Sequence, residues 1–115
     1  MAAQNPHKAA INRKWYHAHK GDAAYARRVA QVNVRQKERR AMVAAIKLAA
    51  GCADCRYKAH PDVLQFDHVP ERGTKMFQIS NGMGRSWTSI LAEITKCDVV
   101  CANCHILRTA VRRSA

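Results

Sequence analysis

The chain has 115 residues, and 20 lysines and arginines against eight acids give it a formal net charge of +12. This length suits one small domain with an appendage and excludes a large apolar core. No apolar stretch approaches the roughly 20 residues that cross a bilayer, and the first residues lack the pattern of a secretory leader. Composition therefore predicts a cytoplasmic protein with no membrane partner.

The positive charge is concentrated in the first half of the chain. Residues 1–51 carry eleven Lys and Arg against two acids, a net charge of +9, whereas residues 52–115 carry +3. A basic excess of this kind points first to a polyanion such as nucleic acid. The alternative is a basic, solvated surface with no such partner, and charge alone does not exclude it.

Two helices are expected in the basic half. Residues 8–20 place Ile11 and Trp15 on one face, and residues 23–50 contain no Gly or Pro before Gly51, a natural helix stop.

Residues 35–40, within the second of these helices, are polar on every side, as in helices that run through solvent. We therefore predict a basic helical arm over residues 1–40, and expect the helix from Ala41 onward to pack on the domain that follows. The arm's predicted phosphate contacts are Arg35, Lys37, Arg39 and Arg40.

Two CxxC pairs enclose most of the remaining chain, with 45 residues between them. Four thiolates at this spacing can close a tetrahedral zinc site that has no open position, which makes the predicted zinc structural. In a reducing compartment such pairs favour metal over disulfide. The predicted zinc ligands are Cys52, Cys55, Cys101 and Cys104. Cys97, the fifth cysteine, is expected to be a small buried residue on a strand.

The segment between the cysteine pairs is expected to contain a β-hairpin. Residues 63–66 alternate like a strand that delivers Asp67 and His68 at its end, and residues 97–100 predict a second strand. Between them we expect a loop, a short extended piece over residues 76–79, and a helix that begins at Ser86 or Ser89 and runs to about Lys96.

A last helix, from about Asn103, places His105, Arg108 and Arg112 on one face. A hairpin followed by this helix would bring His105 close to Asp67 and His68. An Asp oxygen and an imidazole suit a divalent ion that keeps open water positions, and His68 could then take a proton from an attacking water. The alternative is that Asp67 caps a turn, His68 fills the rim of the core and His105 is an ordinary surface residue.

These motifs together resemble the HNH endonucleases, in the subset whose ββα-metal core carries a CxxC…CxxC zinc site. The similarity rests on most of residues 51–113, and residues 1–40 lie outside it. The matching segments are Gly51 to Cys55, Leu64 to His68, Cys97 to His105, and Arg108 with Thr109.

The resemblance implies that Asp67 and His105 bind a catalytic divalent ion, such as Mg²⁺, Mn²⁺ or Ni²⁺, and that His68 is the general base. It implies DNA as substrate, with 5′-phosphate and 3′-hydroxyl products, and a phosphate contact at Arg108; Arg112 and Lys75 are further expected DNA contacts. Many small members are encoded by bacteria or bacteriophages, some beside packaging genes, so phage packaging proteins are candidate partners. Monomer and dimer both remain open.

The chain departs from the family pattern at two positions. Asp67 stands where His is common, and it still offers a metal ligand. The family's middle Asn braces the loop that carries the base. Its expected position falls near Lys96, where no Asn is evident, so Asn103, Asn81 or a backbone contact would have to replace it.

The predicted fold is therefore α+β: a small, zinc-stapled, treble-clef-like ββα-metal core over residues 41–115 with the basic arm before it. The predicted function is a DNA endonuclease that nicks or has weak sequence specificity. A zinc-stapled nucleic-acid-binding module without catalysis is the alternative. A small redox protein is disfavoured, because neither CxxC pair opens a helix after a parallel strand.

Overall fold

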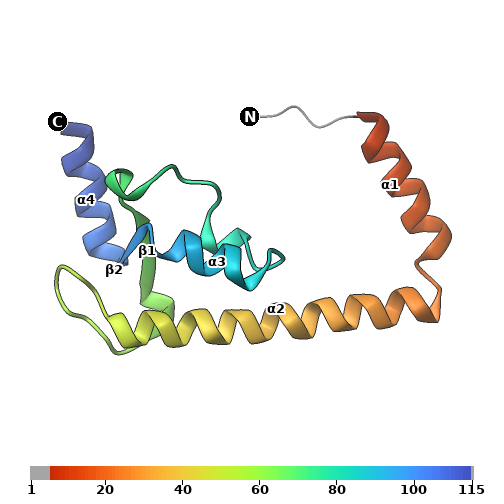
Figure 1. Ribbon diagram of the computed structural model, residues 1–115, viewed down its shortest axis with the longest axis horizontal. Helices are drawn as coiled ribbons and strands as arrows, with labels where there is room; N and C mark the ends of the chain where they lie inside the picture. Colours follow the sequence, from red (N-terminus) through yellow and green to blue (C-terminus); the bar gives the residue numbers. More distant parts are fainter. Residues whose placement is uncertain (1–5, 115) are drawn as a thin grey trace. The chain divides into compact units, whose positions relative to one another are not determined.

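A computed structural model of the chain describes residues 6–114. It is α+β and mostly helical, with one two-stranded antiparallel sheet (Figure 1). The helices and strands are α1 Pro6–His19, α2 Ala23–Ala50, β1 Leu64–His68, α3 Trp87–Ile94, β2 Cys97–Cys101 and α4 Ala102–Ser114. None of the helices in this part of the chain is long and apolar enough to span a membrane.

The chain divides into two compact units, Met1–Arg35 and Gln36–Ala115, and the predicted boundary after residue 40 falls inside the second. In the described part of the first unit, α1 and the start of α2 meet through aromatic rings. Tyr25 contacts Trp15 and Tyr16 edge to face, at 5.6 and 6.0 Å between ring centroids. These rings remain partly exposed, and α1 has no buried residue.

The hairpin of the second unit is followed at once by α4. Leu64 of β1 pairs with Cys101 of β2, and His68 at the other end of β1 pairs with Cys97. Residues 69–96 connect the two strands and include α3. Because α4 begins directly after Cys101, the end of β2 fixes where the first turn of α4 starts.

The core consists of two clusters that share Phe66. One cluster surrounds the hairpin, and its buried members are Cys52, Leu64, Val99, Val100 and Cys101. The other lies beneath α3, and its buried members are Val43, Ile79, Met83 and Ile90. Val43 comes from α2, which confirms that α2 packs on the domain after Ala41.

Local signals explain where the helices begin and end. Gly51 follows α2 with φ +68°, a left-handed conformation that glycine adopts at little cost, so the predicted helix stop is confirmed. The Ser86 hydroxyl accepts a hydrogen bond from the Ser89 N–H and caps α3, as one of the two predicted start positions requires.

The prediction of an extended piece over residues 76–79 is wrong. This stretch is irregular and leads into a 3₁₀ turn at Ile79–Asn81. The Met76 N–H donates to the side chain of Glu93 instead of to a neighbouring strand, and Ile79 is buried in the α3 cluster. Tertiary contacts therefore override the local alternation here.

Leu64 lies at the centre of the hairpin core and is 1% exposed, whereas Leu107 on α4 is 64% exposed. We expect Leu64→Ala to lower the free energy of unfolding by about 2–5 kcal/mol, because it removes buried apolar surface and leaves a cavity. The matched change Leu107→Ala should alter it by less than about 0.5 kcal/mol. Urea unfolding followed by circular dichroism measures both, and equal effects would contradict the core assignment.

Candidate functional site

The four paired cysteines meet at one point of the second unit, where β2 runs into α4. The Sγ atoms of Cys52, Cys55, Cys101 and Cys104 all lie within 4.8 Å of one another. The Cys55 and Cys101 sulfurs are 3.7 Å apart, close to the separation of about 3.8 Å that two thiolates with bonds of about 2.3 Å have on a tetrahedral zinc. This donor set and geometry could hold a zinc ion.

One backbone N–H of each CxxC turn donates to the first thiol of the pair. The Cys55 N–H donates to Cys52 Sγ, and the Cys104 N–H donates to Cys101 Sγ, both at 3.4 Å. Burial raises the pKa of the Cys52 thiol, but the backbone N–H groups of Cys55, Cys101 and Asp54 outweigh burial and lower its pKa to about 6. The two turns thus make equivalent contacts although they lie far apart in the sequence. Cys97 is in the α3 cluster and not among the four.

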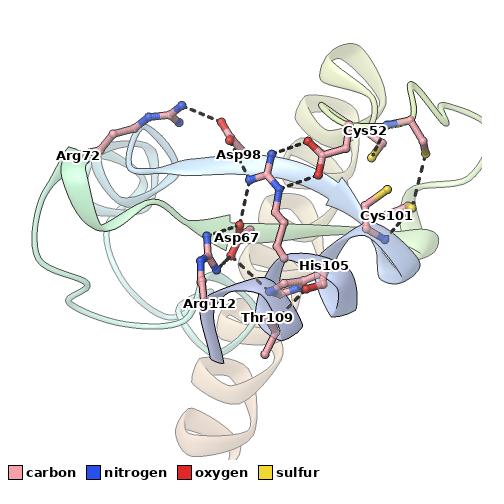
Figure 2. Close-up of polar contacts among 12 residues, drawn as sticks. Cys52, Asp67, Arg72, Asp98, Cys101, His105, Thr109 and Arg112 are labelled. Carbon is pink, nitrogen blue, oxygen red and sulfur yellow. Dashed lines mark hydrogen bonds and ion pairs between the residues drawn. The ribbon is translucent and has the colours of Figure 1, made fainter. Parts of the chain in front are cut away.

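Asp67 is the most heavily bonded carboxylate near the metal site. It is 2% exposed, and its two oxygens accept hydrogen bonds from Arg112 at 2.7 and 2.8 Å and from Arg108 at 3.0 Å. The Nε2 atom of His105 lies 3.5 Å from Asp67 Oδ1. Figure 2 shows Asp67 between Arg112 and His105. The structure therefore brings together two of the three predicted catalytic residues.

The hairpin register places two acids opposite each other, since Asp67 pairs with Asp98. Like charges in this arrangement are destabilising unless a cation separates them. Nη1 of Arg108 donates to both carboxylates, at 3.0 and 2.9 Å, while its Nε and Nη2 donate to Asp54 at 2.7 Å each. Arg108 thus links α4 to both strands and to the first CxxC turn.

The pKa values agree with this arrangement. Arg108 lowers the pKa of the Asp54 carboxyl. Burial raises the pKa of Asp67, but hydrogen bonds from Arg112 and Arg108 outweigh it and lower the pKa overall. Burial also raises the pKa of Asp98, and hydrogen bonds from Arg108 and Arg72 likewise outweigh it. In return, Asp54 above all raises the pKa of Arg108. Arg108 was expected to contact phosphate, and its donors are here engaged by three carboxylates.

His68, the third predicted catalytic residue, points the other way. Adjacent residues of a strand face opposite sides of the sheet, so His68 turns toward α3 while Asp67 turns toward α4. The Nε2 atom of His68 lies 3.2 Å from Oε2 of Glu93, a carboxylate of α3. Asn81 was one candidate to brace this histidine, but its side-chain amide donates to Gln78 at 3.1 Å. The side chain that holds the His68 ring is therefore Glu93.

Although they face different sides of the sheet, Asp67, His68 and His105 line one cavity of about 730 Å³. Four consecutive residues of β1, Gln65 to His68, line this space. The cavity has more cations than acids in its lining. Its charged residues other than Asp67 are Arg40, Lys47, Asp62, Lys75 and Arg112.

The predicted DNA contacts are distributed unevenly about this cavity. Arg40, Lys75 and Arg112 line it, whereas Arg39 donates to the Met83 carbonyl at 2.8 Å. Arg35 and Lys37 are exposed on α2. Lys47, which the sequence did not single out, also lines the cavity. Burial lowers its pKa, and its ammonium lies 5.4 Å from the centre of the Phe66 ring.

Sequence reasoning missed Glu93, which is 1% exposed on α3. A signal was present, because Glu93 is three residues after Ile90 and so lies on the apolar face of that helix. A charged residue on the buried face of a helix must have partners inside the protein, which makes it a candidate for a functional site.

No family model matches this chain, and no curated protein or solved structure shows significant similarity to it. Groups of at least three Cys, His, Asp or Glu side chains can share a metal ion when their ligand atoms lie close together. Among residues 6–114, the four cysteines form such a group, and Asp67, His68 and His105 do not. A second ion would therefore rest on the Asp67 and His105 pair and on water.

The cysteine geometry predicts one zinc per chain. We expect Cys104→Ser to lose the zinc and unfold, because the core is small and binding of the metal supplies folding free energy. Cys97→Ser, the matched control outside the cluster, should keep the zinc. Elemental analysis and circular dichroism measure both outcomes, and a Cys104→Ser protein that keeps its zinc, or a Cys97→Ser protein that loses it, would contradict the assignment.

The Arg108 contacts predict a stability that depends on pH. Arg108→Lys should lower the melting temperature by several degrees, since an ammonium cannot reach three carboxylates together. The matched change Arg113→Lys, at an exposed position of the same helix, should have little effect.

These carboxylates have a lowered pKa in the folded state, so they stabilise the fold above their ordinary pKa of 3.8 and cease to do so as the pH falls through the lowered values. The difference between wild type and Arg108→Lys should therefore shrink as the pH falls below about 4. Acid also releases zinc from the cysteines in both proteins, so the melting temperatures are compared between pH about 5 and 8, where all three carboxylates are ionised and the difference should be constant. A difference that shrinks within that range would contradict the lowered pKa values.

Proposed function

We propose that the protein is a metal-dependent DNA endonuclease of the HNH type, with a structural zinc at the four cysteines. The observation that carries the proposal is that Asp67, His68 and His105 line one cavity whose other charged residues are mainly cations. Each residue alone has an ordinary structural explanation. Together they would supply a base, a pair of metal ligands and a surface for phosphate.

Asp67 and His105 are the residues that would hold the catalytic ion. Their ligand atoms lie 3.5 Å apart, a separation that two neighbouring ligands of one hydrated ion can adopt after a small adjustment. When bound, a divalent ion would neutralise the phosphate and stabilise the leaving oxygen. An ion at Asp67 Oδ1 would compete with Nη1 of Arg112, which donates to the same oxygen. Arg112 would then be released toward the phosphate.

His68 would act as the general base. One nitrogen of the neutral imidazole takes a proton from water, and the water oxygen forms a bond to phosphorus as the bond to the 3′ oxygen breaks. The departing 3′ oxygen gains a proton from solvent, which gives 3′-hydroxyl and 5′-phosphate ends. Arg40, Lys75 and Arg112 would orient the phosphate from the cavity wall.

The basic residues favour weak sequence specificity. Cations that contact phosphates contribute affinity that is independent of sequence and sensitive to salt. Arg35 and Lys37, both exposed on α2, would add further phosphate contacts of this kind. A single active centre cuts one strand per visit, so nicking is the expected activity of the monomer.

A zinc-stapled DNA-binding module without catalysis is the second candidate. The observation that favours it is the saturation of Asp67 by Arg108 and Arg112, which gives this buried carboxylate a purely structural explanation. In that case the cationic cavity would still bind DNA. His68 would have no part in turnover.

Cleavage of supercoiled plasmid separates the two candidates. With Mg²⁺, Mn²⁺ or Ni²⁺ added, the wild-type protein should convert the plasmid to the nicked form. His68→Ala should slow the reaction by about 10²–10⁴-fold while DNA affinity is retained, because it removes only the base. His17→Ala, an exposed histidine of α1, is the matched control and should cleave normally.

EDTA in place of the metal should abolish nicking, and the zinc content of each sample should be measured in the same buffer, since the chelator could also remove zinc from the cysteines. No nicking with any of the three metals, from protein that holds zinc and binds DNA, would overturn the nuclease proposal. That result would support the binding module.

A further inference from the structure

Glu93 is a charged side chain sealed inside the second unit. It is 1% exposed, and burying a carboxylate is costly unless hydrogen bonds replace its water. Oε2 lies 3.0 Å from the Met76 N–H and 3.2 Å from His68 Nε2, and Oε1 accepts from the Lys96 ammonium at 2.8 Å. Every partner is therefore fixed by the fold.

These contacts determine which partner is the donor in the hydrogen bond between His68 and Glu93. Burial raises the pKa of Glu93, but hydrogen bonds from Lys96, from Met76 and from His68 outweigh it and lower the pKa to about 2. An ionised carboxylate only accepts hydrogen bonds, so Nε2 of His68 must carry the proton and donate it. In the neutral ring Nδ1 then holds the free lone pair.

Lys96 in turn fixes Glu93 and the loop beside it. Its ammonium also donates to the Thr74 carbonyl at 2.9 Å, while its own carbonyl accepts from the Val69 N–H at 2.9 Å. The chain from Val69 to Met76 is thus held at both ends around the carboxylate. His68, at the end of β1, has one ring nitrogen anchored in a rigid network.

We infer that Glu93 is a positioning residue for His68: it fixes the ring orientation and keeps Nε2 protonated, which leaves Nδ1 to accept the proton from water. This inference rests on the proposed nuclease function for its catalytic consequence. The choice of tautomer stands on the contacts alone. The alternative role for Glu93 is only to staple the loop through Met76 and Lys96.

Glu93→Gln separates these roles, because the size of the side chain is kept. The Lys96 ammonium will hold the amide oxygen, so the amide NH₂ will face His68 and the Met76 N–H. His68 Nε2 must then accept a hydrogen bond, which moves its proton to Nδ1 and blocks the base. Glu38→Gln, at an exposed position of α2, is the matched control.

The first readout is the tautomer of His68, from long-range ¹H–¹⁵N NMR spectra at about pH 8.5, above the ordinary titration of imidazole. The His68→Ala spectrum identifies the signals. Wild type and Glu38→Gln should show Nε2–H, and Glu93→Gln should show Nδ1–H. An Nδ1–H ring in the wild type would overturn the inference without any variant, even if Glu93→Gln failed to fold.

The second readout is plasmid nicking with Mn²⁺. Glu93→Gln should lower kcat by about two to three orders of magnitude with KM unchanged, since a misplaced proton disables the base but not DNA binding. A changed tautomer with normal kcat would overturn the catalytic role, and an unchanged tautomer would overturn the positioning role. If the wild type shows Nε2–H but does not nick, the nuclease proposal fails and the control of the tautomer stands.

Discussion

The meeting of the two CxxC turns is the constraint on which the rest of the second unit depends. Cys52 and Cys55 follow α2, and Cys101 and Cys104 lie where β2 becomes α4. Joining these points closes 45 residues into a loop and fixes the start of α4 against the hairpin. A zinc ion held there would make this closure permanent, and a domain with a core this small would gain much of its stability from it. The candidate catalytic residues lie on the elements that the closure holds.

Ion pairs and hydrogen bonds to two buried acids position the other candidate catalytic side chains, although the chain as a whole is very basic. Asp67 faces α4 and is held by arginines, whereas Glu93 faces the hairpin from α3 and holds His68. Both carboxylates are almost fully buried and both have a lowered pKa. One strand end therefore presents two residues to the same cavity, each fixed from a different side.

Much of this architecture could be predicted from local sequence. The bounds of α2 followed from a run without Gly or Pro that ends at Gly51, and the hairpin followed from alternation beside Asp67 and before Cys101. The two CxxC pairs predicted that the four cysteines lie together, because cysteines at this spacing most often share a metal ion. These features depend on neighbouring residues, which a single sequence displays.

The partners of the charged residues could not be predicted in the same way. Helical spacing placed Arg108 on the face of His105, but its contacts with Asp54 and Asp98 depend on how the first CxxC turn and β2 lie against α4. Glu93 looked like an ordinary residue of a covering helix, although it bonds His68, which is 25 positions earlier. Which cation meets which acid is decided by packing, and pattern alone contains little of that information.

The central claim is that Asp67 and His105 hold an ion beside His68. Anomalous X-ray diffraction from crystals containing Mn²⁺ tests it most directly. We expect a manganese peak bonded to Asp67 Oδ1 and His105 Nε2, with Arg112 moved from that oxygen. Zinc at the four cysteines, with Arg112 still on Asp67 and no manganese between Asp67 and His105, would contradict it.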